Sequence, residues 1–135
     1  MLLIENGYMI DPGSGREGNY DILTEGDRIR RIGRGLRGEL TGEEREKCLI
    51  LDAEGLLVAP GLVDVHVHFR DPGFTHKEDI LTGAKAAARG GFTTVVLMAN
   101  TKPPVDTEET LQYVLEKGKT TDSHVETCAN VTLGM

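Results

Sequence analysis

From residue 60 onward, apolar strand patterns alternate with amphipathic helix patterns, and this order leaves few possible folds. Apolar runs rich in β-branched residues cover 61–68 and 93–98, and a third strand is expected over 124–131. One helical pattern lies in each gap between them. A strand–helix–strand–helix–strand order with short links predicts a buried parallel sheet. We therefore expect an α/β fold that is either an open parallel sheet or the start of a (β/α) barrel.

Capping signals predict where the two helices begin and end. Thr75-x-x-Glu78 and Asp106-x-x-Glu109 match capping boxes, and Gly90 and Gly118 are typical helix ends. The resulting three strands cannot close a barrel, which needs eight strands and about 250 residues. We expect the 135-residue chain to be the first part of a longer protein.

The first 59 residues contain short apolar runs separated by glycine-containing turns. The runs 22–24 and 29–32 predict one hairpin, and the runs 49–51 and 56–58 predict a second. The charged residues 33–47 between these hairpins are expected to form a solvated loop. This pattern predicts a small, glycine-rich β unit over 1–59, separate from the strand–helix pattern that begins at residue 60.

The composition excludes several classes of partner. A formal net charge of −7 disfavours a broad nucleic-acid or anionic-membrane surface, which needs a basic excess. No apolar run approaches the about 20 residues of a membrane span. The two cysteines do not form a disulfide framework, so a reducing cytoplasm is the expected location.

Asp64, His66 and His68 occupy alternate positions at the end of the first predicted barrel strand. Because side chains in a strand alternate between faces, these three are expected to share one face, with the intervening valines on the other. Two imidazoles on one wall suit a single metal ion, and neutral imidazole is a good zinc ligand. The sequence therefore predicts a metal site at the carboxyl end of this strand, where barrel active sites are built.

Three further polar residues accompany the histidine pair. Arg70 follows the strand, and its guanidinium can hold a carboxylate with two hydrogen bonds. Asn100 ends the next strand at a matching height, where its amide can donate to a substrate oxygen. Asp64 has two readings that remain open: it receives the distal N–H of a ligating histidine, or it is only a polar strand-end residue.

These motifs resemble one enzyme family. Residues 59–73, APGLVDVHVHFRDPG, resemble the first metal motif of the amidohydrolase superfamily in its dihydroorotase form. Residues 77–80 (KEDI), 90–95 (GGFTTV) and 100–103 (NTKP) resemble the following helix, second strand and substrate loop of that family. His-x-His alone indicates only the superfamily, whereas His-x-His-x-Arg-x-Pro-Gly with Asn-Thr-Lys-Pro is typical of dihydroorotase. The N-terminal β segment also resembles that of these enzymes. The resemblance thus implies two domains: a small β-sandwich segment over 1–59, and over 60–135 the incomplete start of a metal-dependent (β/α)8 TIM-like barrel.

The resemblance implies a zinc-dependent hydrolase of pyrimidine biosynthesis, with one or two Zn²⁺ ions, that interconverts N-carbamoyl-L-aspartate and L-dihydroorotate. It implies that His66 and His68 are zinc ligands and that His68, Arg70 and Asn100 bind the substrate. The remaining ligands and the aspartate that shuttles the proton belong to later strands of the family. We therefore expect no catalytic residue within this chain, and no activity from the chain alone.

The implied partner is a small molecule, with no nucleic acid and no membrane. A homo-oligomer or an association with aspartate transcarbamoylase is compatible with the resemblance. Two alternatives stay open. One is another cyclic amidohydrolase, such as a hydantoinase or allantoinase, and the other is a non-catalytic homologue that acts as a partner of aspartate transcarbamoylase.

Overall fold

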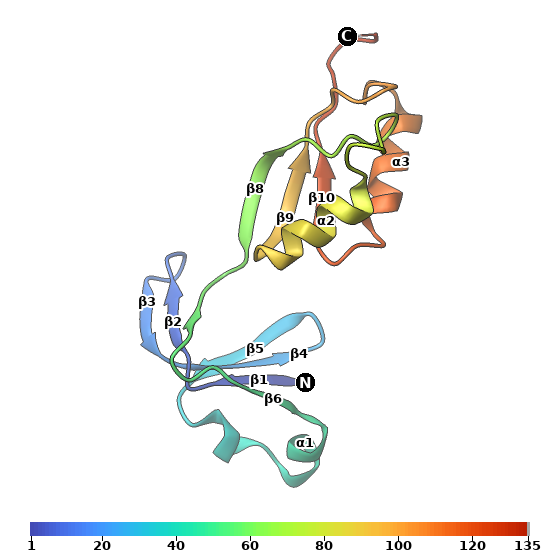
Figure 1. Ribbon diagram of the computed structural model, residues 1–135. Coiled ribbons are helices and arrows are strands. Elements are labelled where there is room, and N and C mark those ends of the chain that lie inside the picture. The colour runs from blue at the N-terminus through green and yellow to red at the C-terminus, as the bar shows by residue number, and fades with distance from the viewer. Residues whose placement is uncertain (135) are drawn as a thin grey trace. The chain divides into compact units, whose positions relative to one another are not determined.

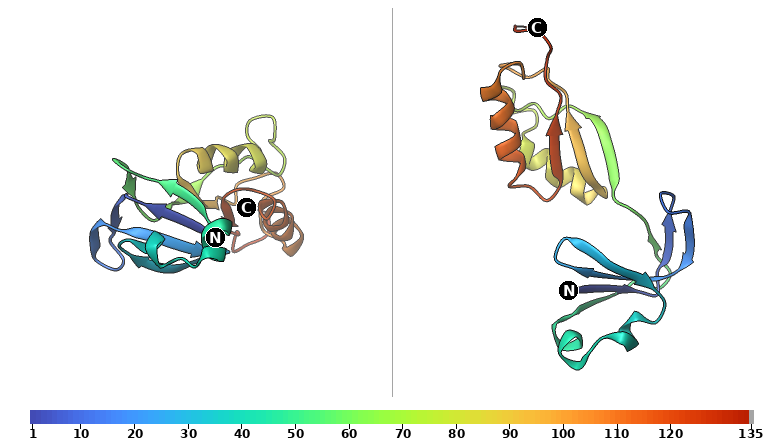
Figure 2. Two further views of the ribbon diagram at one scale, coloured as in Figure 1. Left: turned by 90° about the horizontal axis from the view of Figure 1, so that it is seen from below. Right: turned by 180° about the vertical axis from the view of Figure 1, so that it is seen from behind.

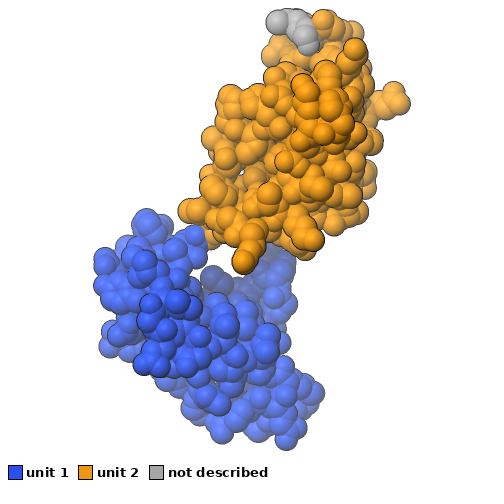
Figure 3. Space-filling model, in the orientation of Figure 1, with its two compact units in different colours: residues 1–60 blue, residues 61–135 orange. Residues whose placement is uncertain are grey.

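A computed structural model describes residues 1–134 of the chain, which divides into two compact units (Figure 1). The units are Met1–Pro60 and Gly61–Met135, coloured separately in Figure 3. Each unit has its own cluster of buried hydrophobic side chains. None of the helices in residues 1–134 is long and apolar enough to cross a membrane.

The first unit is built from two small β-sheets. One sheet has the strand order β5-β4-β1-β6, and the other has the order β3-β2-β7. The strands are β1 (Leu2–Glu5), β2 (Tyr8–Asp11), β3 (Arg16–Asn19), β4 (Asp21–Glu25), β5 (Arg28–Gly33), β6 (Leu49–Asp52) and β7 (Leu57–Val58).

Of the two predicted hairpins, the first is confirmed and the second is wrong. β4 and β5 pair antiparallel, as expected. The predicted strands at 49–51 and 56–58 exist as β6 and β7, but they do not pair with each other. β6 lies parallel to β1 and β7 lies parallel to β2, so the turn between them connects two different sheets.

The segment 33–47 is more ordered than a solvated loop. It contains a 3₁₀ helix, η1 (Leu36–Glu39), and a short α-helix, α1 (Gly42–Lys47). Leu36 and Leu40 are buried and pack in one cluster with Leu3 and Leu23. The loop prediction was wrong because two apolar side chains four residues apart anchor this charged segment to the sheet.

The second unit alternates strands and helices in the order β8-α2-β9-α3-β10, and its parallel sheet has the order β10-β9-β8. Its elements are β8 (Leu62–Val67), α2 (Ile80–Arg89), β9 (Phe92–Leu97), α3 (Glu108–Gly118) and β10 (His124–Thr127). The predicted α/β class with a parallel sheet is confirmed. The third strand is shorter than the predicted range 124–131.

Both helices of this unit pack on one face of its sheet (Figures 1 and 2). Val95 and Leu97 of β9 and Val125 of β10 are buried against Ile80 of α2 and Val114 of α3. The alternation of a strand then turns the intervening side chains of β9 to the opposite face.

The prediction that the first barrel strand is buried is wrong within the described residues. Val63 and Val65 of β8 are 58% and 68% exposed. β8 is an edge strand of the sheet, whereas α2 packs against β9 and α3 packs against β10.

The capping boxes also lie at other residues than predicted. The N-cap of α2 is Asp79, paired with Thr82, rather than Thr75 with Glu78. The N-cap of α3 is Thr107, paired with Thr110, rather than Asp106 with Glu109. In each case a side chain nearer to the first core residue of the helix accepts the N3 amide.

Candidate metal and substrate site

The two histidines of the sequence motif lie beside each other at the carboxyl end of β8. His66 is in the strand and His68 follows directly after it. Their ring centroids are 5.1 Å apart with an interplanar angle of 65°. Both side chains are exposed, so nothing within residues 1–134 encloses them.

This spacing fits a shared zinc ion. Zinc binds imidazole nitrogen at about 2.0–2.1 Å, and tetrahedral ligation by one nitrogen of each ring puts the two ring centres about 5 Å apart. The donor set is incomplete, however. Across residues 1–134 no group of three or more His, Cys, Asp or Glu side chains comes together as a metal site. Catalytic zinc typically has three protein ligands, so these two histidines form part of such a set.

Asn100, which follows β9, contacts the second histidine of the pair directly. Its Oδ1 lies 3.0 Å from Nδ1 of His68. A carbonyl oxygen can only accept a hydrogen bond, so Nδ1 of His68 carries the proton and donates. The lone pair of the ring then resides on Nε2, which makes Nε2 the nitrogen that can bind a metal.

Arg70 lies in the loop 68–79 between β8 and α2. Its backbone N–H donates to the carbonyl of Glu78 at 3.2 Å, and its carbonyl accepts from the N–H of Phe74 at 2.7 Å. Its side chain is half-buried, and the guanidinium has no hydrogen-bond or ion-pair partner among residues 1–134. The backbone of Arg70 is therefore fixed while its five N–H donors remain available to a ligand.

Asp64 makes a local contact. Its Oδ1 accepts a hydrogen bond from the backbone N–H of His66 at 3.0 Å. This contact fixes the backbone of the first histidine, and it is not the contact with an imidazole ring that the sequence suggested as one possibility.

The loops that follow β8 and β9 are joined by their backbones. The N–H of Lys102 donates to the carbonyl of Pro72 at 3.1 Å. Gly73 has φ +94°, and a Cβ placed there would lie 1.9 Å from the Lys102 carbonyl oxygen. This close approach brings the loop of Arg70 against the loop of Asn100, although the two residues are 30 positions apart in the sequence.

The loop 68–79, which contains Arg70, ends at the N-terminus of α2 and is fixed there. The backbone N–H of Thr82 donates to Asp79 at 2.7 Å, and this hydrogen bond lowers the pKa of the Asp79 carboxyl below its ordinary value. A charged Asp79 is also favourable at a helix N-terminus, where the backbone dipoles present a partial positive charge.

A polar cluster around a buried carboxylate lies next to this site and was not predicted from the sequence. Asp71 is fully buried and contacts Tyr113 and Lys117 of α3. The signal that could have found it is the spacing of Tyr113 and Lys117, four residues apart on one helix face, where both reach one partner.

Comparison with known families agrees with the motif. A family model described as "Dihydro-orotase-like" matches residues 55–134. The dihydroorotase of Clostridium acetobutylicum is 50% identical over 135 residues, which are 100% of this chain and 30% of that protein. The dihydroorotase of Clostridioides difficile is 55% identical over 134 residues, or 99% of this chain and 30% of that protein. The chain thus spans about 30% of the length of these relatives.

Solved structures with a similar fold include hydantoinases. The L-hydantoinase of Arthrobacter aurescens matches with a TM-score of 0.77 and 25% identity, over 98% of this chain and 28% of that one. The D-hydantoinase of a Thermus species matches with a TM-score of 0.70 and 32% identity, over 96% of this chain and 27% of that one.

Proposed function

Because this chain belongs to the dihydro-orotase-like family, we propose that it supplies part of the active site of a zinc-dependent dihydroorotase. The complete protein interconverts N-carbamoyl-L-aspartate and L-dihydroorotate, a reversible closure of a cyclic amide in pyrimidine biosynthesis. The observation that carries the proposal is the cluster of His66, His68 and Asn100, with the unpaired guanidinium of Arg70 on the adjoining loop.

In this proposal His66 and His68 hold the zinc ion. A bound zinc ion would polarise the amide carbonyl and lower the pKa of a water molecule to near neutrality. Asn100 keeps His68 in the tautomer with its proton on Nδ1, so the lone pair lies on Nε2, the nitrogen that would bind the ion. Asp64 holds the backbone of His66 and contributes rigidity to the first ligand.

Arg70 and Asn100 bind the substrate carboxylate that takes no part in the ring closure. The planar guanidinium of Arg70 forms two parallel hydrogen bonds to a carboxylate, and the Nδ2 of Asn100 donates a further one. Holding this remote carboxylate orients the reacting amide relative to the histidines. The binding energy of the carboxylate thereby helps to place the reacting atoms in the right geometry.

The second candidate is hydrolysis of a hydantoin-like cyclic amide. The similarity in fold to the two hydantoinase structures favours it. Arg70 and the Asn-Thr-Lys-Pro motif favour dihydroorotate instead. They provide a site for a carboxylate group, and neither hydantoin nor allantoin has a carboxylate.

The test is a substrate comparison with the longer protein that carries this chain. Turnover of dihydroorotate and of N-carbamoyl aspartate is measured beside hydantoin and allantoin, before and after removal of metal with a chelator and re-addition of zinc. We expect zinc-restored turnover of the first pair. Turnover of hydantoin or allantoin without dihydroorotate would establish the second candidate, and inactivity toward all four would favour a non-catalytic partner of aspartate transcarbamoylase.

A further inference from the structure

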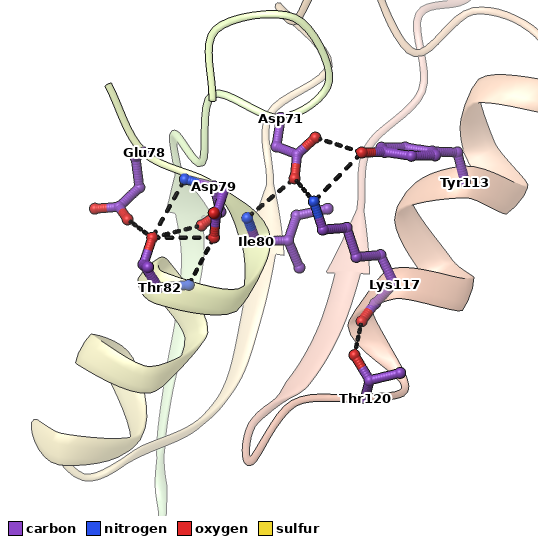
Figure 4. Close-up of polar contacts among 8 residues, drawn as sticks. All are labelled: Asp71, Glu78, Asp79, Ile80, Thr82, Tyr113, Lys117 and Thr120. Carbon is purple, nitrogen blue, oxygen red and sulfur yellow. Dashed lines mark hydrogen bonds and ion pairs between the residues drawn. The ribbon is translucent and has the colours of Figure 1, made fainter. Parts of the chain in front are cut away.

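Asp71, the residue after Arg70, is fully buried, and its carboxylate is surrounded by donors (Figure 4). Its Oδ1 accepts from the hydroxyl of Tyr113 at 2.8 Å. Its Oδ2 accepts from Nζ of Lys117 at 2.5 Å and from the backbone N–H of Ile80 at 3.3 Å. A charged group has thus been taken out of water and given three partners from two helices.

Tyr113 and Lys117 are one turn apart on α3 and converge on this carboxylate, as Figure 4 shows. Burial and the hydrogen bond to Asp71 both raise the pKa of Tyr113. Partial burial acts to lower the pKa of Lys117, but its hydrogen bonds to Asp71 and Tyr113 outweigh this, and its pKa lies above the ordinary value. Both side chains therefore remain protonated donors at neutral pH.

The Asp71–Lys117 ion pair adds little net stability, because the cost of removing the fully buried Asp71 carboxylate from water offsets its attraction to the partly exposed Lys117. The ion pair instead fixes the distance and direction between the Asp71 carboxylate and helix α3. Asp71 directly follows Arg70 in the chain. The N–H of Arg70 donates a hydrogen bond to the carbonyl of Glu78, and its carbonyl accepts one from the N–H of Phe74, within the same loop. Because Asp71 shares a peptide bond with Arg70, holding Asp71 against α3 adds a third restraint on the Arg70 backbone.

We propose that Asp71, Tyr113 and Lys117 form a positioning cluster that uses helix α3 to aim Arg70 at the substrate carboxylate. This inference rests on the proposed function, since it assigns Arg70 a carboxylate to bind. The cluster itself touches no reacting atom. Its effect passes through the main chain from Asp71 to Arg70, across one peptide bond.

The first test measures the loop without any substrate. Hydrogen–deuterium exchange of the segment 70–79 is followed in the longer protein that carries this chain, in Lys117→Met, Tyr113→Phe and Lys119→Met. Lys119 is the matched control because it lies two residues further on, pairs with exposed Glu116 and loses the same charge. We expect faster exchange in Lys117→Met and, to a smaller extent, in Tyr113→Phe. Equal exchange in Lys117→Met and Lys119→Met overturns the proposal.

The second test is a double-mutant cycle with Arg70. We expect Lys117→Met to raise KM for dihydroorotate about 10-fold or more with kcat within about 3-fold, and Lys117→Arg to restore most of the loss. In an Arg70→Ala background, Lys117→Met should change KM less than about 2-fold, because the residue it acts through is gone. An undiminished effect in that background would assign the cluster a general structural role and overturn the proposal.

Tyr113→Phe keeps the test decisive if Lys117→Met does not fold, since it removes one neutral donor and leaves the ion pair. Its control is Tyr8→Phe, which removes a hydroxyl donor to Glu17 in the first unit. A protein that does not turn over dihydroorotate contradicts the proposed function alone. In that case the exchange comparison still decides whether the cluster holds the Arg70 loop.

Discussion

At the scale of single residues, Asn100 joins two functions that the sequence suggested separately. Its Oδ1 contacts His68, a proposed zinc ligand, while its Nδ2 carries the donors proposed for the substrate. One side chain thereby relates the position of the metal to the position of the carboxylate. A variant that changes only one end of the amide can separate these roles.

Asn100→Asp is such a variant. It keeps an oxygen to accept from His68 but replaces the Nδ2 donors by a negative charge. We expect zinc content to be retained, while kcat/KM for dihydroorotate falls about 10- to 100-fold, the loss for a hydrogen bond to a charged group. Metal analysis and steady-state kinetics measure the two effects, with the exposed Asn19→Asp as the charge control. Loss of zinc together with full specific activity per bound zinc would contradict this division of roles.

Arg70→Lys tests the carboxylate contact. A lysine keeps the charge but provides a point donor in place of a planar fork, so we expect kcat/KM for dihydroorotate to fall at least about 10-fold. Arg89→Lys, at the exposed end of α2, is the matched control and should leave kcat/KM within about 2-fold. An unchanged kcat/KM in Arg70→Lys would remove Arg70 from the site.

At the scale of secondary-structure elements, local sequence patterns predicted where the strands and helices lie better than which strands pair with each other. The runs at 49–51 and 56–58 were recognisable as strands, yet the turn between them suggested a hairpin that does not exist. Their pairing with β1 and β2 is parallel and comes from residues more than 40 positions away. Nothing in the turn itself encodes such a partner, because the pairing is decided by which apolar faces meet.

In the candidate site too, local sequence patterns predicted some residues, whereas other contacts depend on tertiary packing. His66 and His68 could be predicted because a strand of period two puts residues i and i+2 on one face. Asn100 could be predicted because neighbouring parallel strands end at the same edge of a sheet. The contacts of Asp71 with Tyr113 and Lys117 span 42 and 46 residues and required the packing of α3 against the loop.

Gly73 provides a test of how tightly the two site loops are joined. Gly73→Ala places a Cβ 1.9 Å from the Lys102 carbonyl oxygen, whereas Gly91→Ala, at a similar φ of +84°, meets no atom within 4 Å. We expect Gly91→Ala to cost about 1–2 kcal/mol from its backbone conformation, and Gly73→Ala to cost about 1–3 kcal/mol more. Calorimetric melting of both variants measures the difference. Equal melting temperatures would show that the loops separate easily.

The first turn of α1 should respond to acid. The backbone N–H of Thr41 and the side chain of Arg30 donate to Glu44 and lower its pKa from 4.5 to about 2. The folded state then holds the proton less tightly than the unfolded state. The stabilisation from Glu44 is complete at pH values well above 4.5, the ordinary pKa of the group, and is lost as the pH falls toward 2.

An NMR titration of the Glu44 carboxyl measures this directly. We expect a midpoint near 2 in the unmodified chain, and a higher midpoint in Arg30→Gln because one of the two donors is removed. A midpoint of 4.5 in the unmodified chain would mean that the capping box does not persist in solution.

At the scale of the whole molecule, residues 1–135 offer zinc two imidazoles and no third clustered ligand among the described residues. We expect this chain by itself to bind zinc more weakly than the longer protein and to show no turnover of dihydroorotate. Its affinity should fall as the pH is lowered, because protons compete with the metal for the imidazole nitrogens.

Competition with a chromophoric chelator measures this affinity. The variant His66→Ala/His68→Ala should lose it, while the exposed His76→Ala should keep it. Zinc binding that survives the double substitution would place the metal elsewhere on the chain.

The proposed site has two parts: His66 and His68 hold the metal, and Arg70 and Asn100 hold the substrate carboxylate. Anomalous diffraction at the zinc edge, from crystals of the longer protein grown with N-carbamoyl aspartate, tests both parts together. We expect a zinc peak bonded to His66 and to Nε2 of His68, with a carboxylate of the ligand bridging the Arg70 guanidinium and the Asn100 amide. A zinc peak away from these histidines, or a ligand carboxylate that contacts neither Arg70 nor Asn100, would contradict this proposal.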